Sequence, residues 1–193
     1  MRMRCRWGGH VVQMPRLRLQ TPTAVDMAGV LAAASDPHAQ RWLGWTDKAV
    51  TRARRWQEQG FLDVSPGRGA KRHPKGEDWL LAAVDPLGER LVGGVSFHKK
   101  TGEIGGWLAP QFRGRGLGAD LFAGVAEFAH QHLGVPSVIA GTETSNAACI
   151  GALSTAGFLP MDGPEKHVLA DGRVIPSRWF RHESSSPSYC WRI

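Results

Sequence analysis

The sequence predicts a mixed α/β (α+β) domain with a central, mostly antiparallel sheet of about seven strands and helices on both faces. Three observations lead to this prediction. The chain has 193 residues, which is the size of one domain. Between residues 103 and 156, apolar strand-like segments alternate with segments of helical period, an order that requires parallel neighbours. Short turns at 85–88, 101–102 and 171–172 join strands directly, which requires antiparallel neighbours.

The first sixty residues predict one strand and three helices after a basic start. Residues 1–15 are expected to form a flexible extension outside the fold, because they are basic, interrupted by glycine and lack a signal-peptide apolar stretch. Residues 16–20 alternate between polar and Leu side chains, which is typical of a half-buried strand. The Thr-Pro pair at 21–22 and the Asp-Pro pair at 36–37 each predict a helix start. A third helix is expected over 47–59.

The remaining segments complete a single domain over residues 16–183. A loop rich in glycine, proline and charge covers 61–78. Strands are predicted at 79–84, 90–98, 103–108, 137–140, 165–169 and 174–182. Helices are predicted at 114–132 and 146–156, and the second is ended by Gly157. Residues 184–193 are expected to be a C-terminal tail.

Composition and charge narrow the class of protein. No apolar run approaches the roughly 18 residues that a membrane span needs, so no membrane partner is expected. Cys5, Cys149 and Cys190 lie far apart, without the spacing of a disulfide scaffold or a zinc site, which favours the cytoplasm and no metal. The net charge of +7 reflects either genome composition or an anionic partner such as a phosphorylated cofactor, an acidic substrate or RNA.

The most informative segment is 111–118, Gln-Phe-Arg-Gly-Arg-Gly-Leu-Gly, which follows a predicted strand and opens a predicted helix. Glycines let backbone N–H groups approach a ligand, and a helix N-terminus favours an anion. The alternative is a tight turn that merely needs positive φ. A P-loop is excluded, because no Lys-Ser/Thr pair follows Gly116. A Rossmann fingerprint fits the spacing but belongs in a first βα unit, whereas here a three-strand meander precedes it.

A third phosphate motif, Gln/Arg-x-x-Gly-x-Gly/Ala, is matched by the segment from Arg113 to Gly118. With this motif in place, the chain resembles the GNAT superfamily of N-acetyltransferases, and most of all its RimJ/RimL-like, ribosomal-protein branch. The resemblance covers residues 16–183 and rests on the order of several segments. They are Ala34-Ser-Asp-Pro37, Arg41-Trp-Leu43, Glu103-Ile-Gly-Gly-Trp-Leu108, the Arg113–Gly118 loop, Asn146-x-x-Cys149, Ala156-Gly-Phe158 and Asp171-Gly-Arg173.

The resemblance implies acetyl-CoA, or another acyl-CoA, as co-substrate and no metal. The cofactor would lie where the strand before the loop splays from its neighbour. The positions implied to bind it are Trp107, Leu108, Ala109, Arg113, Gly114, Arg115, Gly116, Leu117, Gly118 and Asn146. The first three would contact the pantetheine and the acyl carbonyl, and the loop amides would hold the pyrophosphate. Asn146 also has the position of an N-cap residue, and the two roles are compatible.

The implied chemistry is the attack of a neutral amine on a thioester, which needs a base for the amine and a proton for the thiolate. Glu103 matches the acidic residue of this strand in the branch and is expected to be the base; a solvated strand-end carboxylate is the alternative. The chain has one tyrosine, Tyr189, in the tail, so the usual tyrosine acid of the superfamily has no obvious counterpart. Cys149 stands where the branch often has serine, as a thiol donor, a covalent nucleophile or a buried cysteine.

The acceptor site is expected beneath the first helices and the 61–78 loop. Trp42 and Trp45 would shape it. His98 and Glu143, both at predicted strand ends, are expected as further contacts and are lesser candidates for the base. Gly106 replaces the aromatic residue that the branch usually has, which predicts a wider site. The acceptor is expected to be a small-molecule or peptide amine, and the protein a monomer or homodimer. Two rival functions stay open: transfer from aminoacyl-tRNA, which the basic charge favours, and a non-catalytic CoA-binding module.

Overall fold

The computed structural model describes residues 2–6, 9–33, 35–46, 78–87 and 90–185 of the chain. Three sequence predictions fall outside these residues: the helix over 47–59, nearly all of the loop over 61–78, and the tail beyond residue 185. In the described part, no helix is both long enough and apolar enough to cross a membrane.

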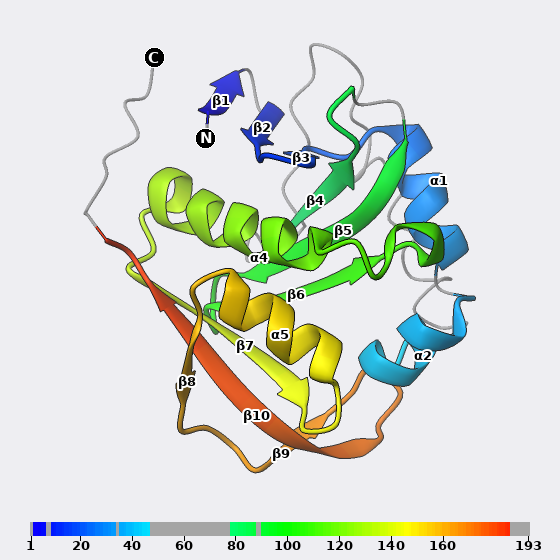
Figure 1. Cartoon of the computed structure of the whole chain (residues 1–193), viewed down its shortest axis with the longest axis vertical. Helices are drawn as coiled ribbons and strands as arrows, with labels where there is room; N and C mark the ends of the chain where they lie inside the picture. The colour runs from blue at the N-terminus through cyan, green and yellow to red at the C-terminus, as the bar shows by residue number, and fades with distance from the viewer. Residues whose placement is uncertain (1, 7–8, 34, 47–77, 88–89, 186–193) are drawn as a thin grey trace.

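A single mixed sheet of ten described strands forms the centre of the molecule, in the order β1-β2-β3-β4-β5-β6-β7-β10-β8, with β9 paired to β10 (Figure 1). All pairs are antiparallel except β6 with β7. The strands are β1 Arg2–Arg6, β2 Gly9–Gln13, β3 Arg18–Gln20, β4 Asp78–Val84, β5 Leu91–His98, β6 Glu103–Leu108, β7 Ser137–Glu143, β8 Leu159–Met161, β9 Lys166–Val168 and β10 Val174–Glu183. The mixed, mostly antiparallel fold predicted from the sequence is confirmed.

The N-terminal segment departs from the prediction, because residues 2–6 and 9–13 form strands of the sheet. β1 and β2 form a hairpin, and β2 continues the sheet through the pairs Val11↔Gln20 and Val12↔Leu19. Val12 is fully buried and Met14 is 8% exposed, so both belong to the core. This hairpin and β8 raise the number of strands from the expected seven to ten.

The helices are α1 Ala24–Ala33, α2 Pro37–Leu43, α4 Leu117–Glu127 and α5 Ala147–Thr155. A π-helical turn, η2 Phe128–His132, extends α4, and a 3₁₀ turn, η1 Pro110–Phe112, precedes it. α4 and α5 lie side by side over one face of the sheet (Figure 1), where a Cβ on Gly118 would come within 2.9 Å of the Ala152 Cβ. Gly118 is therefore a packing glycine that lets the two helices approach.

The start of α1 lies later than the Thr-Pro pair predicts. The Thr23 hydroxyl accepts the Asp26 N–H at 3.1 Å, and the Asp26 carboxylate accepts the Thr23 N–H at 2.9 Å. This reciprocal pair is a capping box, which satisfies two N–H groups at the helix start. Thr21 instead accepts the N–H of His10 and so ties the end of β3 to β2.

The parallel pair of β6 and β7 separates almost at once. The two strands share only the register pair Glu103↔Ile139, beside the hydrogen bond from the Ile139 N–H to the Gly102 carbonyl. Beyond these residues the strands diverge toward their carboxyl ends (Figure 1). The described sheet therefore opens at Glu103, and the opening faces the turn between β6 and α4.

A cluster of rings encloses His10 on β2. Its ring lies 4.2 Å from that of His132, 5.2 Å from that of Trp79 and 5.3 Å from that of Phe128, centroid to centroid. Burial, and to a smaller extent the nearby His132, lowers the pKa of His10 to about 4. The folded protein therefore favours the neutral imidazole of His10.

This environment predicts a loss of stability in mild acid. An unfolded His titrates near pH 6.5, so the unfolded chain takes up a proton before the folded one does. The stability that His10 contributes is present above about pH 6.5 and is lost as the pH falls from there toward 4. We expect His10→Gln, which does not titrate, to show a smaller fall of the thermal midpoint between pH 7 and pH 4.5 than the wild type. Parallel pH curves for the two proteins would contradict this assignment.

Candidate functional site

A cavity of about 420 Å³ lies between the diverging strands β6 and β7 and the helices α2, α4 and α5. Nine of the sequence-predicted site residues line it: Trp42, Glu103, Trp107, Leu108, Arg113, Gly118, Glu143, Asn146 and Cys149. Segments that are far apart in the sequence thus meet at the opening of the sheet. The remaining predicted residues lie around the cavity or away from it.

Strand alternation divides the cavity lining into two faces. On β6, a Cβ on Gly106 would come within 3.0 Å of Leu121 in α4, so the even-numbered positions face that helix. Glu103 and Trp107 therefore face the opposite side. Trp107 meets Trp45 there, with 5.8 Å between ring centroids. The side chain of Glu103 therefore lies on the opposite side of β6 from α4 and from the glycine-rich loop that precedes this helix.

Glu103 stands at the closed end of the opening. It begins β6, pairs with His98 on β5 and with Ile139 on β7, and is half-buried. Glu143 ends β7, four residues beyond Ile139, which is about 13 Å of strand. The two carboxylates thus occupy different ends of one cavity, and Glu143 accepts a hydrogen bond from the Ser145 hydroxyl at 2.8 Å.

The glycine-rich loop adjoins the cavity at its two ends, since Arg113 and Gly118 line the cavity and residues 114–117 do not. Gly114 and Gly116 both have φ of +72°, the left-handed region that favours glycine. Gly116 is the N-cap of α4, whose first N–H groups have no carbonyl partner within the helix. Nothing lies within 4 Å of the position that a Cβ on Gly114 would occupy, so the loop has open space beside it. Backbone donors, a helix N-terminus and open space together fit a bound phosphate.

The side chain of Arg113 lines the cavity and has partners on two other segments. Its Nε donates to the Leu108 carbonyl at 2.9 Å, and its Nη1 and Nη2 bind the carboxylate of Asp36. The same carboxylate caps α2 by accepting the Ala39 N–H at 3.0 Å. The hydrogen bond from Arg113 and burial act in opposite senses on Asp36, and its pKa is lowered. Arg113 therefore connects the loop to α2, and its guanidinium is committed to Asp36.

Two further predicted residues have partners of their own. The N–H of Ala109 donates to the Val92 carbonyl at 2.8 Å, so it continues the sheet and does not project into the cavity. Arg115 stacks over the ring of Phe112, with its guanidinium carbon 5.7 Å from the ring centroid, and is exposed. His98 is exposed at the end of β5 and does not line the cavity.

Asn146 and Cys149 occupy the start of α5. The Asn146 side chain accepts the Cys149 N–H at 3.1 Å, which makes Asn146 the N-cap, as the sequence predicts. Burial raises the pKa of the Cys149 thiol, although a hydrogen bond with Thr142 partly opposes the shift. A thiol held in its protonated form is poorly suited to attack as a thiolate.

Gly106 lines the cavity, and the wider site expected there stays a prediction. A Cβ at this position would come within 3.0 Å of Leu121 Cδ2 and 3.3 Å of Phe122 Cε1. These side chains of α4 occupy the space next to Gly106, so the glycine allows α4 to approach the sheet. The wall of the cavity there is made by the helix instead of by a side chain of β6.

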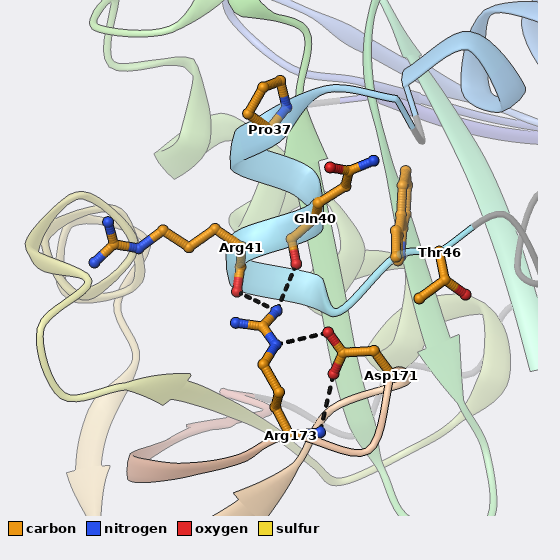
Figure 2. Close-up of a pocket in the computed structure, with 7 residues that line it drawn as sticks. Pro37, Gln40, Arg41, Thr46, Asp171 and Arg173 are labelled. Atoms are coloured by element: carbon orange, nitrogen blue, oxygen red, sulfur yellow. Dashed lines mark hydrogen bonds and ion pairs between the residues drawn. The ribbon is translucent and has the colours of Figure 1, made fainter.

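A second, shallower hollow of about 510 Å³ adjoins α2 (Figure 2). Trp45 lines this hollow, although the sequence places it in the acceptor site. Arg173 donates to the Gln40 carbonyl at 2.6 Å and to the Arg41 carbonyl at 3.0 Å, and its Nε binds Asp171 at 2.6 Å (Figure 2). The backbone N–H of Arg173 and its guanidinium lower the pKa of Asp171. The turn between β9 and β10 therefore braces the C-terminal end of α2.

Sequence reasoning missed three residues of the site. Asp36 was assigned only to a helix start, Thr142 was given no role, and Arg16 was assigned only to a strand. The Arg16 guanidinium reaches the glycine-rich loop, where it donates to the carbonyls of Arg115 and Gly116. The partners of Asp36 and Arg16 lie 77 to 104 positions away in the chain, so no local pattern signals them.

The chain matches known proteins in sequence profile and in fold. The profile of the acetyltransferase (GNAT) domain matches residues 16–159. A search of curated protein sequences gives no match. Among solved structures, the chain is similar to RimL, a ribosomal L7/L12 alpha-N-protein acetyltransferase in complex with coenzyme A. The TM-score is 0.69 at 13% identity, over 90% of this chain and 97% of that one.

Two other similar structures come from named organisms. Spermidine N-acetyltransferase from Vibrio cholerae, in complex with CoA and spermine, gives a TM-score of 0.70 at 11% identity, covering 88% of this chain and 96% of that chain. RimJ from Mycobacterium smegmatis gives 0.68 at 15% identity, covering 90% and 86%. At such identities these likenesses establish the fold alone. Together with the profile match over most of the chain, they show that this protein belongs to the GNAT acetyltransferase family.

Proposed function

We propose that this protein transfers an acyl group, acetyl in the simplest case, from a CoA thioester to a primary amine. The proposal is carried by one arrangement: a glycine-rich helix start adjoining a cavity that runs between diverging parallel strands and carries Glu103 at its closed end. The similar structures with CoA support the same donor. Acyl-CoA supplies the activated thioester carbonyl, and the residues of this chain bind and orient it.

The proposed reaction is a direct attack in a ternary complex. The amine nitrogen forms a bond to the thioester carbonyl carbon, and the carbon–sulfur bond breaks. Glu103 accepts the amine proton, directly or through water. Its side chain lies on the side of β6 opposite α4. Cys149 returns a proton to the departing thiolate, because it lines the cavity and burial keeps its thiol protonated. The pKa of an α-amine is near 8, so a carboxylate base gives enough help to deprotonate it near neutral pH.

The proposed acceptor is an amine on a peptide N-terminus or on a small molecule. The similar structures include enzymes named for a ribosomal protein and for spermidine, so the fold serves both acceptor classes. We place the reaction in the cytoplasm on the ground that the three widely spaced cysteines suit a reducing compartment. The rival donor, aminoacyl-tRNA, is favoured by the basic charge of the chain, whereas the intact Arg113–Gly118 loop favours acyl-CoA.

The assignment of Glu103 predicts a specific kinetic defect. We expect Glu103→Gln to lower kcat at pH 7 by about 10- to 100-fold, while the Kd for CoA changes less than threefold. The difference in kcat between Glu103→Gln and the wild type should shrink as the pH rises above 8, because a larger fraction of the acceptor amine is then already deprotonated. The assay is thiol release from acetyl-CoA with a panel of amines.

Glu143→Gln is the comparison, because it removes the other carboxylate that lines the cavity and is a lesser candidate for the base. A larger loss of kcat there than in Glu103→Gln would assign the base to Glu143. A Glu103→Gln enzyme with wild-type kcat at pH 7 would show that another base or water accepts the proton. If the wild-type protein binds CoA but releases no thiol with any amine, the protein is a CoA-binding module and the proposed transfer is wrong.

A further inference from the structure

The side chain of Arg16 contacts the carbonyl groups of the glycine-rich loop. It lies in the turn between β2 and β3, which is closed by the hydrogen bond from the Met14 N–H to the Leu17 carbonyl at 3.0 Å. Its Nη1 donates to the Arg115 carbonyl at 3.1 Å, and its Nη2 donates to the Gly116 carbonyl at 2.8 Å. Two consecutive peptide groups of the loop are therefore held by one guanidinium.

The same guanidinium is fixed by Asp120 in the first turn of α4. Arg16 Nε lies 3.0 Å from Asp120 Oδ2 and Nη2 lies 3.2 Å from Oδ1, while the backbone N–H of Arg16 also donates to Oδ2 at 3.1 Å. A planar guanidinium with a two-oxygen partner has little freedom to turn. Asp120 also balances the positive charge, so Arg16 acts on the loop mainly through geometry.

Peptide geometry then sets the direction of the loop amides. In a planar trans peptide, the N–H of one residue points opposite to the carbonyl of the residue before it. Because the carbonyls of Arg115 and Gly116 point to Arg16, the N–H groups of Gly116 and Leu117 point away from it. These two N–H groups belong to the start of α4, where an anion gains from the helix dipole.

We infer that Arg16 is a positioning residue for the acyl donor: it holds the peptide groups of 115–117 so that their amides face the donor's diphosphate. The inference rests on the proposed function. It also explains the glycine at position 116, where a Cβ would stand 2.8 Å from Arg16 Nη1. Arg16 itself touches neither the donor nor the reacting atoms, and it contributes by fixing two donors before the ligand arrives.

Two acetyl donors separate this role from general structural damage. Acetyl-CoA carries the diphosphate, whereas S-acetylpantetheine has the same thioester without it. We expect Arg16→Met to raise the KM for acetyl-CoA about tenfold or more, with kcat largely kept. The loss of one hydrogen bond between a loop amide and the charged diphosphate weakens binding by about that factor. The KM for S-acetylpantetheine should stay within twofold. Arg16→Lys, which lacks the planar fork, should fall between Met and the wild type.

Arg181→Met is the matched control, since Arg181 pairs with Glu183 on the exposed part of β10. It should leave the KM for both donors unchanged. A wild-type KM for acetyl-CoA in Arg16→Met would overturn the inference, and so would an equal loss with both donors. If Arg16→Met does not fold, Arg16→Lys gives the same comparison. Failure of the wild type with both donors would instead count against the proposed function.

Discussion

Replacing Gly116 with glutamate is expected to abolish measurable binding of CoA. The residue has φ of +72°, and a side chain in this left-handed conformation costs roughly 1–2 kcal/mol. Its Cβ would also stand 2.8 Å from Arg16 Nη1, so the guanidinium has to move. A carboxylate there would compete with Asp120 for Arg16 and release the carbonyls of Arg115 and Gly116. The loop amides would then lose their orientation, and a negative charge would be added close to the diphosphate.

A pair of alanine variants separates backbone strain from the contact with Arg16. Gly116→Ala combines positive φ with the close approach, and we expect its Kd for CoA to rise about tenfold or more. Gly134→Ala has a similar φ of +68° but nothing within 4 Å of its Cβ, so it carries the strain without the clash. Calorimetric titration should give a wild-type Kd for Gly134→Ala. CoA binding by Gly116→Glu with wild-type affinity would place the diphosphate elsewhere.

Removing residues 1–13 is expected to destabilise the fold by several kcal/mol. The truncation deletes β1 and β2, uncovers the edge of β3 and removes the fully buried Val12 together with His10. Burying one aliphatic side chain contributes about 1.5–3 kcal/mol, and the strand pairing adds to this. For a domain of this size, each kcal/mol lowers the thermal midpoint by about 2–4 °C, so a fall of about 10 °C or more is expected.

The same truncation should weaken CoA binding, because the turn that carries Arg16 loses one of its two strands. Val12→Ala serves as the comparison, since it leaves the turn in place and removes only buried methyl groups, at a cost of about 1–3 kcal/mol. Thermal melts and CoA titrations of the three proteins give both readouts. A truncated protein with the wild-type midpoint would mean that the N-terminal hairpin adds nothing to the core.

The fold was predictable where local patterns agree with the final packing. The meander β4–β6, the helix after the glycine loop and the β9–β10 hairpin each have a periodic run and a turn signal. The N-terminal hairpin was missed because its basic residues and glycines suggest an extension, whereas its order comes from pairing with β3. β8 contains Pro160, which weakens a strand signal, and it is held by β10.

Motif and order single out the glycine loop, Asn146 and Glu103 as site candidates, and the structure brings Glu103 and Asn146 to one cavity. Their roles stay predictions. Charges were harder to assign. The guanidinium of Arg113 binds Asp36 and that of Arg115 lies over Phe112, and neither partner is evident from the sequence. Such pairings depend on which segments the fold brings together, so the spacing of residues in the sequence does not predict them.

The most direct test of this account is a calorimetric titration of the full chain with acetyl-CoA, repeated with pantetheine and at high salt. The account predicts near-stoichiometric binding of acetyl-CoA in the micromolar range, clearly weaker binding of pantetheine, and a loss of affinity with salt that is confined to acetyl-CoA. Absence of acetyl-CoA binding, or equal affinity for the two ligands, would contradict the claim that the glycine-rich loop holds the diphosphate of an acyl-CoA donor.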